Sequence, residues 1–74
     1  MYKAKNGFTL KDNKTPDGWT IETPQDIITA LLSYPAFETV ATGFILEAIA
    51  QAMESRKEYA DIEDLAQELS ENYI

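Results

Sequence analysis

Carboxylates are the side chains through which this sequence could do chemistry, because it has 13 Asp and Glu residues and neither His nor Cys. The missing imidazole and thiol groups exclude zinc fingers, disulfides, thiolate nucleophiles and the commonest general base. Glu63 and Asp64 are adjacent, and adjacent helical residues point about 100° apart, so they cannot share a site as acid and base. Glu47 and Glu54 are seven residues apart, as two acids on any solvated helix face can be. The sequence therefore predicts no catalytic residues.

The other candidate sites fail on composition or spacing. No serine has a histidine to activate it. The segment 12–18 is rich in oxygen ligands, but a calcium loop needs them at its first, third and fifth positions, where Lys14 and Pro16 break the rule. The three glycines are scattered and form no phosphate-binding loop. We expect neither a metal ion nor a cofactor, and no enzyme activity.

The elements that carry these side chains follow from the spacing of apolar residues. Apolar residues alternate in 8–10 and again in 19–21, and the segment between them is dense in turn formers, which predicts a β-hairpin of these two runs. Thr23 and Pro24 have the residue types of a helix N-cap and first helical position, and Pro35 ends this first helix.

The second predicted helix begins near Pro35 or Ala36 and runs to about Glu54. Its apolar residues repeat at three and four and cover more than one face, so we expect it to be the central element. Asp61 is predicted to cap a third helix. The core is expected to contain Trp19, Ile28, Leu31, Leu32, Val40, Phe44, Ile45, Ile49, Leu65 and Leu69.

Together these elements predict a small α+β fold, in which an N-terminal β-hairpin packs on three α-helices with a central apolar helix. Residues 1–74 form one domain, with a hairpin region at 1–23 and a helical region at 24–74. The most apolar stretch is interrupted by polar residues, which indicates a buried helix and no membrane span. Without cysteines or an apolar leader, the expected location is cytoplasmic.

Charge is distributed unevenly along the chain. Residues 24–54 contain four acids and no base, and residues 55–74 contain six acids against two bases. The helical region therefore carries −8 and the hairpin region +1, which gives the net charge of −7. A body of this charge repels DNA, RNA and anionic membranes, so direct binding to nucleic acid or to a membrane is not expected.

The acidic helices predict a non-enzymatic module that inhibits or regulates a basic protein partner. Acidic helix faces, small size and the lack of a catalytic set resemble the general design of DNA-mimic inhibitors carried by phages and mobile elements, although no motif identifies such a family. Two alternatives stay open: the acids only keep the protein soluble, or the chain is a structural or assembly subunit that forms a homodimer through its apolar helix surface. The predicted partner-binding residues are Glu47, Glu54, Glu63, Asp64, Glu68, Glu71 and Tyr34.

Overall fold

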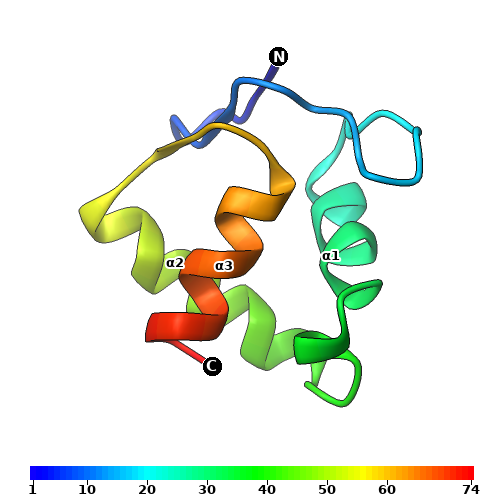
Figure 1. The fold of residues 1–74 in the computed structure, drawn as a ribbon. Coiled ribbons are helices and arrows are strands. Elements are labelled where there is room, and N and C mark those ends of the chain that lie inside the picture. Colours follow the sequence, from blue (N-terminus) through cyan, green and yellow to red (C-terminus); the bar gives the residue numbers. More distant parts are fainter.

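Three helices pack against a small three-stranded sheet that lies at one end of them (Figure 1). The computed structural model describes all 74 residues. In chain order the elements are β1 (Tyr2–Lys3), β2 (Thr9–Leu10), α1 (Pro24–Leu32), the 3-10 helix η1 (Pro35–Phe37), α2 (Thr42–Ser55), β3 (Glu58–Tyr59) and α3 (Ile62–Asn72). This confirms the predicted α+β fold with an N-terminal hairpin on three helices. None of these helices has both the length and the apolar character that crossing a membrane requires.

The sheet has β2 at its centre. On one side β2 pairs antiparallel with β1, so that Tyr2 lies opposite Leu10. On the other side it pairs parallel with β3, so that Leu10 also lies opposite Tyr59. The turn between β1 and β2 contains Gly7, whose φ of 95° is in the left-handed region that favours glycine. The sheet thus joins the start of the chain to the connection between α2 and α3.

The predicted pairing of residues 8–10 with residues 19–21 is wrong. Residues 13–21 instead close into a separate small loop, in which Lys14 and Thr20 form an isolated antiparallel bridge. The N–H of Ile21 donates to the carbonyl oxygen of Asn13 at 2.7 Å, and Gly18 adopts a φ of 96°. The backbone groups at the two ends of the turn-forming segment bond to each other. Both edges of β2 are occupied, one by β1 and the other by β3.

The predicted single helix from residue 35 or 36 to about 54 is divided. Residues 35–37 form η1, the chain turns through 38–41, and α2 begins with Ala41 as an extended N-cap that has no side-chain hydrogen bond. In one continuous helix Phe37 and Phe44, seven residues apart, would share a face. The turn changes the rotational phase, so Phe37 is buried while Phe44 is 54% exposed and Ile45 faces the core.

The N-terminal segment of the chain contributes more residues to the core than the sequence predicts. The prediction that Leu32 and Phe44 belong to the core is wrong. Leu32, at the end of α1, is 38% exposed, and the rotational phase of α2 turns Phe44 toward solvent. Trp19, Val40 and Ile49 are only partly buried and pack against the core from outside. The expected residues that are buried are Ile28, Leu31, Ile45, Leu65 and Leu69, and the strands and loops add Tyr2, Phe8, Leu10, Ile21 and Tyr59.

The start of α1 has the predicted cap. Thr23 Oγ1 accepts the N–H of Asp26 at 3.2 Å, and Asp26 Oδ2 accepts the N–H groups of Glu22 at 2.9 Å and of Thr23 at 3.0 Å. These hydrogen bonds, the one from Glu22 above all, hold the pKa of Asp26 below its ordinary value of 3.8. The ionised carboxylate is therefore the form that stabilises the fold.

We predict that Asp26→Asn lowers the free energy of unfolding at pH 7 and that the difference from the wild type disappears in acid. A carboxyl group whose folded pKa is lowered stabilises the fold above its unfolded pKa, and this contribution is lost as the pH falls through the folded pKa. Urea unfolding followed by circular dichroism, at pH 7 and at a series of values below 3.8, measures the difference. A difference that does not change with pH contradicts this role of Asp26.

Candidate functional site

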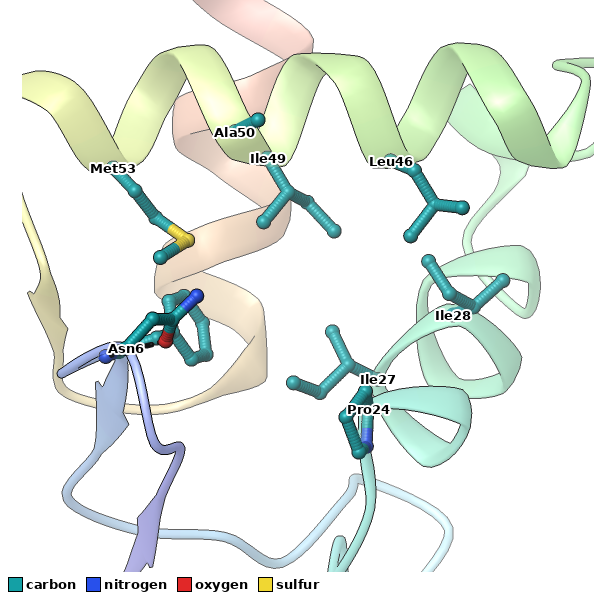
Figure 2. Close-up of a pocket in the computed structure, with 9 residues that line it drawn as sticks. Asn6, Pro24, Ile27, Ile28, Leu46, Ile49, Ala50 and Met53 are labelled. Atoms are coloured by element: carbon teal, nitrogen blue, oxygen red, sulfur yellow. Dashed lines mark hydrogen bonds between the residues drawn. The ribbon is translucent and has the colours of Figure 1, made fainter.

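An apolar groove lies between α1 and α2 and is closed at one end by the β1–β2 turn (Figure 2). Its volume is about 340 Å³, in the range of pockets that bind small ligands. Seven of the nine lining residues are apolar. The lining residues are Asn6, Phe8, Pro24, Ile27, Ile28, Leu46, Ile49, Ala50 and Met53.

The α2 wall of the groove is a second apolar face of that helix. Leu46, Ile49, Ala50 and Met53 have the spacing of one helical stripe, and Leu46 follows the buried Ile45, so the stripe is rotated by about 100° from it. Leu46 is 51% exposed, Ala50 is exposed, and Ile49 and Met53 are partly buried. Burying one face of α2 against the core has left this second apolar face only partly covered, with Leu46 and Ala50 exposed.

The opposite wall and the floor are parts of the core. Ile27 and Ile28 come from α1 and Phe8 from the strand side, and all three are buried. In Figure 2 the Ile28 and Leu46 side chains face each other across the groove. Because these three side chains are packed in the core, the α1 wall and the floor of the groove are already formed without a ligand.

The hairpin end of the groove has the one polar side chain of the lining. Asn6 Oδ1 accepts the N–H of Phe8 at 3.2 Å, so the amide nitrogen is left to donate. The aliphatic part of the Lys57 side chain lies at the same turn, where its Cδ would be 3.6 Å from a Cβ placed on Gly7. This end therefore offers hydrogen-bond donors and positive charge.

Two of the predicted partner-binding residues border the groove. Glu47 and Glu54 are exposed and form no ion pair. They are three residues before and four residues after Ala50, which makes them its neighbours on the surface of α2. The outer edge of the groove is therefore acidic along α2.

Two other predicted residues, which are partly buried, form ion pairs with Arg56 at the surface. Its guanidinium pairs with Asp64 and lies 4.0 Å from Glu68 Oε2, while it also sits 4.4 Å from the centre of the Tyr59 ring. Asp64 Oδ2 further accepts the N–H of Ala60 at 3.0 Å. Asp64 and Glu68 thus share one arginine at the connection between α2 and α3, which compensates one of their two negative charges.

Tyr34 and Glu63 lie together at a second, shallower groove between η1 and α3, with a volume of about 410 Å³. The Tyr34 hydroxyl is buried without a hydrogen-bond partner. This burial raises the pKa of Tyr34 above 10.0, and the negative charges of Glu63, Asp61 and Asp17 raise it further. The structure therefore places uncompensated acids around Tyr34.

The remaining predicted residue, Glu71, is exposed on the last turn of α3, where it accepts a hydrogen bond from Gln67 at 3.3 Å. Nowhere in the chain do three or more Asp and Glu side chains converge as a metal site would require. The groove residues of α2 are not among the site residues predicted from the sequence. Their signal was present in Leu46 and Ala50, which extend the apolar face beyond what one packed face needs.

The chain was compared with known proteins in three ways. No protein-family model matches it, and neither a curated protein nor a solved structure does.

We predict that Leu46→Ala changes the free energy of unfolding by less than about 1 kcal/mol, because its side chain is already half in water. The matched control Ile45→Ala removes a fully buried side chain one position earlier and should cost about 2–5 kcal/mol. Urea unfolding of both variants measures the two effects. Equal destabilisation would mean that Leu46 belongs to the core and that the groove is not a free surface.

Proposed function

We propose that this chain is a non-enzymatic protein-binding module that docks on a basic partner protein and so inhibits or regulates it. The observation that carries the proposal is the uncompensated charge of the helices. Residues 24–74 contain ten carboxylates, of which those of Glu58, Asp64 and Glu68 are in ion pairs, so seven are outside any ion pair. Exposed charge of one sign steers an oppositely charged partner and accelerates its association.

Protein is the partner class that this charge favours. Phosphate backbones and anionic lipids are repelled by the −8 of residues 24–74. A nucleic-acid-binding protein has the complementary surface, since it uses Lys and Arg to neutralise phosphates. A narrower form of the proposal is therefore a DNA-mimic inhibitor, whose carboxylates occupy the positions of phosphates.

A second candidate function is a structural or assembly subunit that self-associates. It is favoured by the exposed apolar side chains of α2, Phe44 and Leu46. It is opposed by charge, because a two-fold interface through the groove brings Glu47 and Glu54 toward the same acids of a second copy. We therefore favour binding to a basic partner over self-association.

Neutralising the free acids is expected to abolish capture of the partner. The test variant combines Glu47→Gln, Glu54→Gln, Glu63→Gln and Glu71→Gln. The matched control removes as much charge elsewhere, through Asp12→Asn, Asp17→Asn, Glu22→Gln and Glu38→Gln. Each immobilised protein is incubated with nuclease-treated extract of the native host, and the bound proteins are eluted with rising salt.

Because salt screens exposed charges over about 8 Å at physiological strength, the partner should elute as salt rises. We expect a basic protein on the wild type and on the control, and about tenfold less of it on the test variant. Equal recovery on the test variant and on the control would contradict the proposal. Recovery of the chain itself, in place of a basic protein, would do the same and would support self-association.

A further inference from the structure

We propose that the groove between α1 and α2 binds an amphipathic helix of the partner, whose apolar face fills the groove and whose Lys or Arg residues lie along α2. This inference rests on the proposed function and names the part of the partner that is recognised. It is carried by three properties of the groove: its shape, its exposed apolar wall and the charge of its two helices.

The shape of the groove suits a helix as its occupant. The α2 wall consists of two rows with a spacing of four residues, Leu46 with Ala50 and Ile49 with Met53. Such rows are the ridges that pack into the grooves of a neighbouring helix. From Leu46 to Met53 the wall is roughly 10 Å long, or two helical turns. Ala50 is the small member of the wall, which lets a partner side chain approach the α2 backbone.

Covering the exposed part of the apolar wall would be favourable, because it removes apolar surface from water. Leu46 is 51% exposed, and Ile49 and Met53 are partly exposed beside it. A helix that presents apolar residues at spacings of three and four would remove this surface from water together with its own. The opposite wall is held in place, because Ile27 and Ile28 are already buried in the core. Little reorganisation is required for binding.

The charge of the two helices specifies the chemistry of the occupant. Residues 24–55, which include α1 and α2, contain four acids and no Lys or Arg. Glu47 and Glu54 stand beside Ala50 on the outer edge of the wall and have no basic neighbour in an ion pair. A helix with basic residues beside its apolar face would pair with them.

A second copy of this chain does not have that chemistry. None of α1, α2 and α3 contains a Lys or Arg residue, and all three contain acids. A helix of a second copy in the groove would therefore bring like charges together. The observations favour a basic helix from another protein.

The test uses a fluorescein-labelled synthetic peptide of Leu and Lys, about 15 residues long so that it can form a helix. Its Leu residues follow a spacing of three and four. One control peptide has the same composition in scrambled order, and a second has Glu in place of Lys. Fluorescence anisotropy at several salt concentrations gives the dissociation constants for the full-length chain.

Two protein variants each remove one exposed apolar side chain of α2. Leu46→Ser deletes an exposed apolar side chain of the groove, whereas Phe44→Ser deletes one on a different side of α2. We expect the Leu/Lys peptide to bind with a dissociation constant on the order of micromolar, about tenfold weaker to Leu46→Ser and unchanged to Phe44→Ser. Glu47→Gln with Glu54→Gln should weaken binding and flatten its salt dependence. The scrambled and Leu/Glu peptides should bind at least about tenfold more weakly.

Several results would overturn the inference. These are equal binding of the ordered and scrambled peptides, equal effects of Leu46→Ser and Phe44→Ser, and a salt dependence that the two Glu→Gln substitutions leave unchanged. A dimer in sedimentation equilibrium that Leu46→Ser dissociates would also overturn it, since the groove would then be occupied by a second copy. If the acidic variant loses the captured protein while the peptide fails these controls, the proposed function stands and this inference falls. If the peptide passes them but no basic protein is captured, the proposed function fails instead.

Discussion

The rotational phase of α2 decides which of its apolar residues enter the core and which line the groove. A helix packed against one core can bury one face, and α2 has apolar residues on more than one. The turn at residues 38–41 sets the phase so that Ile45, Ala48 and Ala52 are buried. The face with Leu46 and Met53 is then left beside α1 and becomes the wall of the groove. The acids that border this wall follow from the same phase, because they are fixed to the same helix.

Local signals in the sequence predicted the helix starts at Thr23 and Asp61, whereas the strands β1 and β3 and the placement of the elements depend on distant contacts. The caps at Thr23 and Asp61 are read from neighbouring residues, and the structure has both. The strand pairing was wrong because β2 takes its second partner from β3, almost 50 residues later, which no local alternation reveals. The turn before α2 escaped prediction since no glycine or proline marks residues 38–41. That one turn explains why Phe44 is outside the core.

The candidate site was predicted in its charge but not in its geometry. The sequence shows the acids of α2 and α3 equally, but the structure separates those held by Arg56 from those that are free. Arg56 reaches Asp64 and Glu68 only because the chain reverses through β3. The surplus apolar residues of α2 indicated an uncovered face. They could not show that α1 and the hairpin turn enclose it as a groove, because these elements are brought there by the tertiary fold.

If the second apolar face of α2 is a docking surface with an acidic edge, a bound helix must change the surroundings of its side chains. Methyl NMR spectra of the protein during titration with the Leu/Lys peptide measure this change. We expect shifts that are concentrated on the methyl groups of Leu46, Ile49 and Met53 and on those of Ile27 and Ile28 across the groove. Shifts concentrated on α3 or at Tyr34, or spread evenly over the surface, would contradict docking at this face.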